Sequence, residues 1–155
     1  MSGALWAWAA RAWAAPGVAE AGLALQDHQG QNPPLLLWAG WCALTGRPLD
    51  EETLEAACDT ARAWNETVVA PLRALRRTLK APVPDLEDAA RLSVRAGVKA
   101  VELEAERHLL DALEALAGPP GTPHPAAEGL VAAARAWDRT VPRAGLQHLA
   151  ALLPA

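Results

Sequence analysis

The sequence has no tyrosine, no phenylalanine and one methionine, although it contains seven tryptophans in 155 residues. Two cysteines are too few for a disulfide-rich scaffold, and both stand among apolar neighbours in helical patterns. We therefore expect Cys42 and Cys58 to be reduced core thiols of a cytoplasmic protein. Gly-x-Ser-x-Gly, phosphate-loop and Cys-x-x-Cys motifs are missing, and the histidines are scattered, so the sequence indicates no catalytic residue.

Charge and hydropathy exclude further classes of function. A formal net charge of -4 and a pI near 5.5 argue against nucleic-acid binding, which normally leaves a basic footprint. The apolar run at residues 35–44 is shorter than the roughly 20 residues that cross a bilayer, so we expect a buried helix and no membrane partner. The alanine-rich N-terminus lacks a charged leading region and carries Arg11, so we do not interpret it as a signal peptide.

The remaining composition predicts an all-α fold. Alanine, leucine, arginine and glutamate dominate, and no segment alternates with the period of a strand. We predict a compact bundle of about five helices in residues 1–117, a Pro/Gly-rich linker at 118–125, and a loosely packed C-terminal extension of two short helices at 126–155. The expected signals are a first helix beginning after Ser2, a stop at Gly30, N-caps at Asn32, Asp50 and Asp85, and a kink or a restart of the helix at Pro71.

Helical periodicity also predicts which sides are buried. The third helix, apolar all round, should be enclosed by the others, with Trp38 and Trp41 anchoring the core and their indole N–H groups bonded to a carbonyl or to Asp27. The alternative is that these tryptophans line an exposed groove. Two apolar rows should face the core: Leu72, Leu75 and Leu79, and then Val94, Val98, Val101, Ala105, Leu109, Ala112 and Leu116. Opposite the second row, we expect an exposed, salt-bridged face of Arg91, Arg95, Lys99, Glu102 and Glu106.

Two polar clusters are candidate binding residues. In the turn at residues 25–32 the cluster is Gln26, Asp27, His28 and Asn32, and a carboxylate in the last helical turn opposes the helix dipole. This cluster is either an ordinary helix–helix turn, with Asp27 paired to an arginine, or part of a functional site. The second cluster, Arg73, Arg76, Arg77 and Lys80, follows i, i+3, i+4, i+7 spacing. It is either a solvated face or a site for phosphate or for an acidic partner.

Metal and cofactor binding have little support in the sequence. A carboxylate-bridged metal bundle needs paired Glu-x-x-His motifs, and the chain offers instead the i, i+4 pair of Glu104 and His108. We therefore expect no cofactor and no metal.

The motifs LWAWA, PGVAEAGLALQDHQG, NPPLLLWAGW, PLRALRRTLK and VKAVELEAERHLLDALEAL together resemble a family of small proteobacterial proteins classed as a domain of unknown function. The resemblance covers residues 4–117 and implies a bacterial, cytoplasmic, helical protein without implying an activity. Gln31 and the Pro33-Pro34 pair depart from the family pattern, which suggests a stiffer turn here. The family's distinctive polar positions correspond to Gln26, Asp27, Asn32, Arg73, Arg76 and Arg77.

Three functional hypotheses follow. The leading one is a non-enzymatic interaction or adaptor module. In it, the second cluster, which we call the arginine stripe, and a groove lined by Trp41 dock an acidic protein segment or a partner helix. The second is a small-molecule-binding bundle, with or without catalysis, that uses Asp27, His28 and Arg73. The third is a homodimer whose groove is its own interface.

Overall fold

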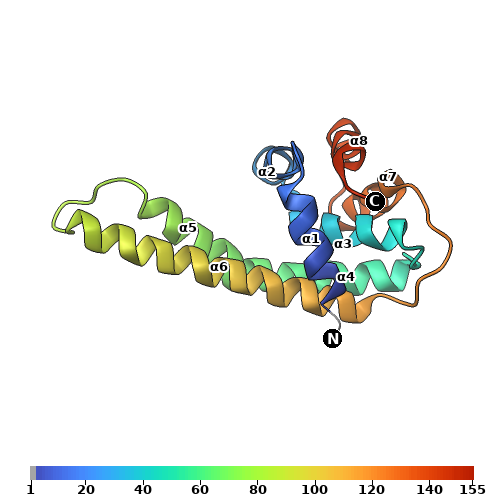
Figure 1. Cartoon of the computed structure of the whole chain (residues 1–155), viewed down its shortest axis with the longest axis horizontal. Helices are drawn as coiled ribbons and strands as arrows, with labels where there is room; N and C mark the ends of the chain where they lie inside the picture. Colours follow the sequence, from blue (N-terminus) through green and yellow to red (C-terminus); the bar gives the residue numbers. More distant parts are fainter. Residues whose placement is uncertain (1–2) are drawn as a thin grey trace.

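The computed structural model describes residues 3–155 and is helical, which confirms the all-α class. Ser2, after which the first helix was expected to begin, lies outside the described residues. Figure 1 shows a cluster of helices from which one long hairpin extends. The elements are α1 (Ala4–Ala14), α2 (Val18–Gln29), α3 (Pro33–Leu44), α4 (Glu51–Trp64), the π-helical turn η1 (Asn65–Val69), α5 (Ala70–Thr78), α6 (Asp88–Leu116), α7 (Ala126–Trp137) and α8 (Arg143–Leu152).

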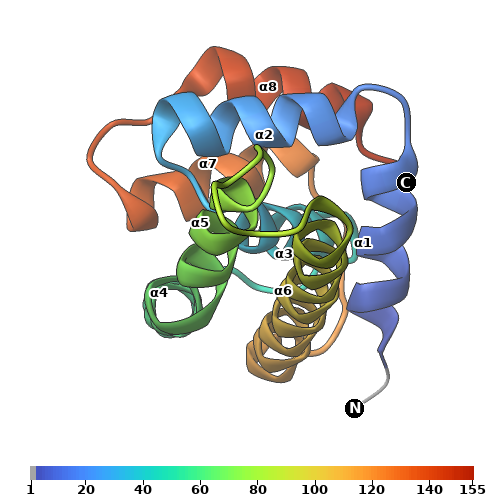
Figure 2. The ribbon, with the colours of Figure 1, turned by 90° about the vertical axis from the view of Figure 1, so that its left-hand side faces the viewer.

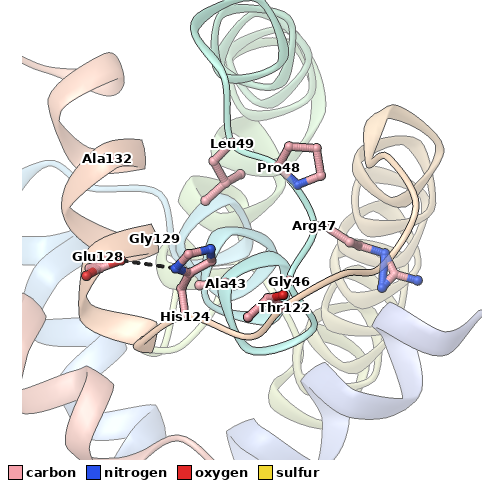
Figure 3. Close-up of a pocket in the computed structure, with 10 residues that line it drawn as sticks. All are labelled: Ala43, Gly46, Arg47, Pro48, Leu49, Thr122, His124, Glu128, Gly129 and Ala132. Atoms are coloured by element: carbon pink, nitrogen blue, oxygen red, sulfur yellow. Dashed lines mark ion pairs between the residues drawn. The ribbon is translucent and has the colours of Figure 1, made fainter.

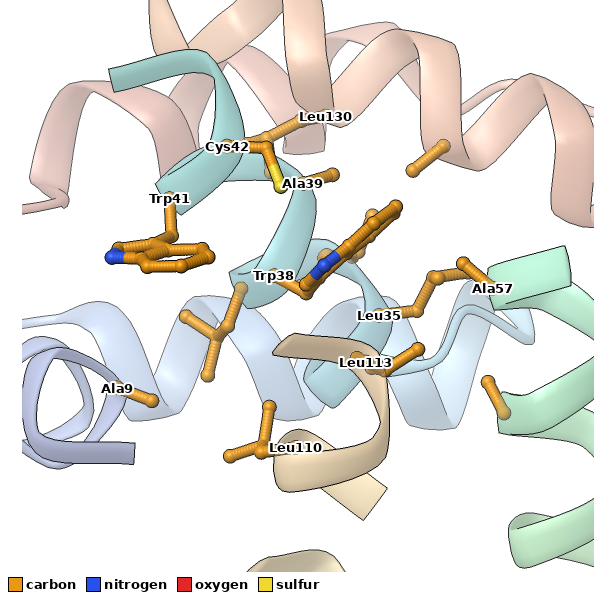
Figure 4. Packing of buried hydrophobic residues seen from close by; sticks show 14 of the residues in the cluster. Ala9, Leu35, Trp38, Ala39, Trp41, Cys42, Ala57, Leu110, Leu113 and Leu130 are labelled. Atoms are coloured by element: carbon orange, nitrogen blue, oxygen red, sulfur yellow. The ribbon is translucent and has the colours of Figure 1, made fainter. Parts of the chain in front are cut away.

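Helix α3 lies at the centre of the core, as its apolar composition predicts. Ten of its twelve residues are buried, and α1, α2, α4, α6 and α7 all pack against it. Trp38 is fully buried, and Figure 4 shows it among the packed core residues that include Leu35 and Leu113. Its indole Nε1 has no hydrogen-bond partner within residues 3–155, so the expected bond to a carbonyl or to Asp27 is not formed. Trp38 therefore contributes apolar area rather than a polar link.

The expected caps define the ends of the first helices. The Asn32 side chain accepts a hydrogen bond from the Leu35 backbone N–H at 3.0 Å, and Asp50 accepts one from Thr53 at 2.8 Å, which lowers the pKa of Asp50. Gly30 ends α2 with a φ of 65°, in the left-handed region where glycine pays no steric penalty.

One boundary differs from the prediction. Asp85 does not cap the long helix: it takes a φ of 70° in the preceding turn, and the Glu87 side chain caps instead by accepting from Ala89 and Ala90. The restart expected at Pro71 is present, because α5 begins at Ala70 with Pro71 in its first turn, directly after the widened turn η1. A proline lacks the N–H of the regular ladder, so a π-helical turn just upstream is a natural adjustment.

The C-terminal helices are not the loose addition that the linker suggested. The backbone N–H groups of Gly121 and His124 donate to the carbonyls of Thr45 and Ala43, which fixes residues 118–125 against the end of α3. Leu130, Leu146 and Leu149 are fully or almost fully buried in the same core as α3. A run rich in proline and glycine predicts irregular backbone correctly, but it does not predict mobility.

The outer half of α6 forms an arm with α5. Figure 1 shows this hairpin extending away from the other helices, and Figure 2 looks along it from its tip. In that view α2, α7 and α8 lie above the hairpin. Of the described helices, none meets a membrane-spanning criterion of both length and apolarity.

The crossing of α3 and α7 gives a direct test of the core. A Cβ added to Gly129 would lie 2.5 Å from the Ala39 carbonyl oxygen, whereas one added to Gly97 in α6 would meet nothing within 4 Å. Gly129→Ala should therefore lower the free energy of unfolding by about 1–3 kcal/mol through overpacking. Gly97→Ala should raise it by about 0.5–1 kcal/mol, because alanine is the better helix former. Urea denaturation measures both, and equal effects would contradict this packing.

The two thiols give a second test. Cys42 and Cys58 are both buried and free among the described residues, and burial raises the pKa of Cys42 to about 12 and raises that of Cys58. Because the thiolate is the reactive species, both should resist an aromatic disulfide reagent at pH 8 in the native protein and react after denaturation. Rapid labelling of the native protein would contradict the burial of these groups.

Candidate functional site

The arm is held together by charged side chains that point inward. Glu102 is buried in the contact between α5 and α6, where Arg76 Nε donates to it at 2.6 Å and Arg73 Nε lies 3.4 Å away. Glu106 lies 3.7 Å from Arg73, and desolvation raises its pKa. We call this contact the polar seam, and it comprises Arg73, Arg76, Arg91, Arg95, Glu102 and Glu106.

The tip half of the polar seam is made by arginines bonded to backbone carbonyls. Arg91 Nη1 donates to the carbonyls of Leu79 and Lys80 at 2.6 and 3.2 Å, and Arg95 Nε donates to the Arg76 carbonyl at 3.2 Å. These carbonyls end α5, where positive charge is favourable. The expectation that Arg91, Arg95 and Glu102 form an exposed face is therefore wrong, because Arg91 and Glu102 are buried against α5.

Because the charged side chains of the polar seam point into the hairpin, apolar side chains are left on its outer surface. Helical spacing puts the two predicted apolar rows on one side of the hairpin and Arg73 and Arg77 on another side. That second side faces α2, where Arg77 pairs with Asp27. Leu75, Val94 and Val101 are 45%, 57% and 48% exposed, so the outer parts of these rows do not face a core as predicted. In the second row, Ala105 and Leu109 are buried where the other helices cover α6, Ala112 is half-buried, and Leu116 at the end of α6 is exposed again. We call the outer part of these rows the apolar face; it is formed by the exposed Leu75, Val94 and Val101 and by the half-buried Leu72, Leu79 and Val98.

The other candidate site lies at the base of the arm. A cavity of about 330 Å³ brings together five of the sequence-predicted binding residues: Gln26, Asp27, Asn32, Arg73 and Arg77. Arg76 belongs to the polar seam, and His28 and Lys80 are exposed outside the cavity. Trp41 is buried elsewhere, with the Arg47 guanidinium 4.1 Å from its ring centroid. No groove lined by Trp41 accompanies the arginine stripe in the described part of the chain.

Asp27 is paired with an arginine, as one of the two sequence interpretations supposed. Arg77 Nη2 donates to Asp27 Oδ1 at 3.3 Å, and Gln26 Nε2 donates to the same oxygen at 3.2 Å. The hydrogen bond from Gln26 is the largest cause of the lowered pKa of Asp27, followed by the effect of Arg77. All three residues line the cavity, and the two charged partners are substantially exposed.

Sequence reasoning missed three residues of this cavity. Gln31 is 3% exposed, and neither its Nε2 nor its Oε1 has a hydrogen-bond partner among residues 3–155. Each buried donor or acceptor without a hydrogen-bond partner lowers the free energy of unfolding by about 1–3 kcal/mol. Asn65 begins the π-helical turn, and Trp137 reaches the cavity from α7. The sequence marked Gln31 in one way, by its departure from the family pattern. It gave no sign that Asn65 and Trp137 belong to the cavity, because they lie in segments far from residues 25–32 along the chain.

A second cavity, of about 300 Å³, lies between the end of α3 and residues 118–125 (Figure 3). His124 Nδ1 is 3.7 Å from Glu128 Oε2, and both side chains are largely exposed. Its polar groups do not converge on a buried partner. Residues 3–155 also hold no cluster of three or more histidine, cysteine, aspartate or glutamate side chains arranged for a metal.

Comparison with known proteins identifies the family. The sequence profile described as "Protein of unknown function (DUF2390)" matches residues 4–113. The chain belongs to the DUF2390 family. No curated protein and no solved structure matches it.

The DUF2390 match separates the two candidate sites in one respect. It spans the whole arm, from α5 to the outer half of α6, and all of α2 and α3. Trp137, which completes the cavity, lies beyond it. The polar seam and the apolar face are therefore features of the DUF2390 region, whereas one wall of the cavity is supplied by the C-terminal helices.

The polar seam can be tested through its central carboxylate. Glu102→Gln keeps the shape of the side chain but leaves Arg73 and Arg76 without their buried negative partner. We expect the free energy of unfolding to fall by about 1–3 kcal/mol, with faster hydrogen exchange in α5. Glu104→Gln, at a position that is mostly exposed, should change stability by less than about 0.5 kcal/mol. Similar effects of the two substitutions would show that the polar seam does not hold the arm.

Proposed function

We propose that this DUF2390 protein is a non-enzymatic protein-interaction module whose contact surface is the apolar face of the arm. The observation that carries the proposal is the inverted arrangement of the hairpin, with arginines and glutamates inside and leucines and valines outside. A hairpin that had to be stable alone would gain more by burying its aliphatic side chains and solvating its charges. The inverted arrangement is favourable when another surface covers the aliphatic side.

The arginine stripe supports an acidic partner less well. Glu102 and Glu106 already neutralise Arg73 and Arg76, and Arg77 is bonded to Asp27. A docked acidic segment would have to displace these partners. An aliphatic surface, by contrast, can dock on the apolar face without breaking an ion pair.

The occupant that fits the apolar face best is the arm of a second copy. On the apolar face, aliphatic residues of both α5 and α6 meet, and a second arm placed against this face would complete a four-helix bundle. Val94 and Val101 lie symmetrically about the midpoint between Gly97 and Val98. An antiparallel two-fold pair centred on that midpoint would set Val94 of each copy against Val101 of the other, as a self-complementary interface requires. All six residues of the apolar face are aliphatic, so pairing desolvates no charge.

Sedimentation analysis at micromolar concentration tests this pairing. The wild type should sediment as a dimer, and the double variant Val94→Glu, Val101→Glu should sediment as a folded monomer with unchanged helical circular dichroism. The matched control is Leu92→Glu, Leu103→Glu, which changes two similarly exposed residues on the opposite side of the same helix segment. This control should remain a dimer.

Two results would overturn the proposal. A wild type that remains a monomer up to about 100 μM would remove the second copy as the occupant. Equal loss of dimer in both double variants would place the contact elsewhere on the arm.

A further inference from the structure

The two rows of the apolar face lead inward to a pair of stacked rings. On α6, Val94, Val101 and His108 recur at seven-residue intervals, so the three side chains share one side of the helix. The Trp64 ring at the end of α4 stacks on the His108 ring, with centroids 6.1 Å apart and an interplanar angle of 10°. His108 is largely exposed and Trp64 is half-buried. We call this pair the aromatic platform, and it forms the inner end of the apolar face.

The π-helical turn brings Trp64 into line with the apolar row of α5. Trp64 and Leu72 are eight positions apart, whereas two α-helical turns hold about seven residues. The i→i+5 bonding of η1 takes up the additional position, so Trp64, Val68 and Leu72 follow one side of the continuous segment from α4 to α5. A regular α-helix would rotate Trp64 away from this row. The turn therefore has a definite effect, which is to place a large ring beside the apolar face.

The tip of the arm carries an exposed apolar side chain in a defined position. Leu86 is 49% exposed, and its backbone N–H donates to the Val83 carbonyl at 3.2 Å. Asp85, directly before it, takes a positive φ of 70°, which is uncommon for a residue with a side chain. Backbone strain of this kind is found most often where a segment makes a functional contact. The turn thus presents Leu86 at the outer end of the arm.

The antiparallel pairing of arms brings these two features together. Glu87 and His108 lie at equal separations from the midpoint between Gly97 and Val98, on which that pairing is centred. In a pair with two-fold symmetry about this midpoint, Glu87 and the neighbouring Leu86 of each copy therefore reach the aromatic platform of the other. Helices α2, α7 and α8 lie on the opposite side of the hairpin and leave this approach free (Figure 2).

We propose that the aromatic platform receives the arm tip of a second copy, with Leu86 of one copy packed against the Trp64 and His108 rings of the other. This inference rests on the proposed pairing through the apolar face and adds one contact at each end of it. Packing an exposed leucine on the two rings removes apolar area from water. The contact also selects the orientation of the pair, because two parallel arms would set tip against tip and leave both platforms uncovered.

Sedimentation equilibrium of the full chain tests the contact from both sides. Leu86→Ala should raise the dimer Kd by roughly tenfold, because both ends of the interface lose apolar area. His108→Ala should raise it similarly. The matched control is Leu92→Ala, which shortens a similarly exposed leucine on the opposite side of α6 and should leave Kd within about twofold. Helical circular dichroism should be unchanged in all three variants, since each position is exposed.

A mixture of two variants shows whether the contact joins different copies. Both ends are damaged in each variant homodimer. A heterodimer of Leu86→Ala with His108→Ala keeps one intact end, where an unchanged tip meets an unchanged platform. The heterodimer should therefore be tighter than either homodimer by roughly threefold, beyond the statistical factor. Fluorescence energy transfer between differently labelled copies measures this affinity.

The outcomes separate this contact from the pairing on which it rests. A wild type that remains a monomer would overturn both. A dimeric wild type whose Kd is unchanged by Leu86→Ala would overturn the platform contact and leave the pairing through Val94 and Val101 in place. If both variants weaken the dimer but the heterodimer is no tighter than the homodimers, Leu86 and His108 do not meet across the interface, and the platform contact is again overturned.

Discussion

The contact of Glu102 with Arg73 and Arg76 determines the character of the arm. A buried carboxylate needs cationic partners, and the two arginines must then face α6 rather than the solvent. Since α5 is a regular helix, turning Arg73 and Arg76 inward rotates Leu75 outward. Arg91 and Arg95 extend the same orientation to the tip by bonding the last carbonyls of α5. The apolar face is thus a geometric consequence of the polar seam.

The polar seam also links the two candidate sites. Arg73 contacts Glu102 and Glu106 and lines the cavity, while Arg77, one turn later, joins the arm to α2 through Asp27. The core around α3 is enclosed by α1, α2, α4, α6 and α7 through apolar contacts, and it adjoins the cavity at Leu109.

Much of the fold could be predicted because its signals are local. Asn32, Asp50 and Gly30 set helix ends through their own side chains or backbone. The prediction of an N-cap at Asp85 was wrong because Glu87, two residues later, takes the capping role. Asp85 instead occupies the position of the turn that has a positive φ. The enclosed position of α3 follows from a helix with no polar side.

The orientation of the arm could not be predicted, because periodicity identifies a stripe but not what lies against it. The row from Val94 to Leu109 is one continuous stripe, yet the body covers just its inner end. For the cavity, Asp27, Asn32 and the arginines were identifiable by residue type and spacing. Gln31 was not, since a glutamine beside a turn is ordinary until its burial is known, and Trp137 lies more than 100 residues away along the chain.

The most direct test of an inverted arm with a covered face is the maleimide labelling rate of Val101→Cys as a function of protein concentration. The native thiols are buried and give little background, and Leu103→Cys provides an exposed reference on the opposite side of the same helix. We predict that Cys at 101 labels as fast as Cys at 103 at nanomolar protein and becomes protected at micromolar protein, where the arms pair. Slow labelling at every concentration would show that Val101 faces the inside of the hairpin, and fast labelling at every concentration would show that no second copy covers it.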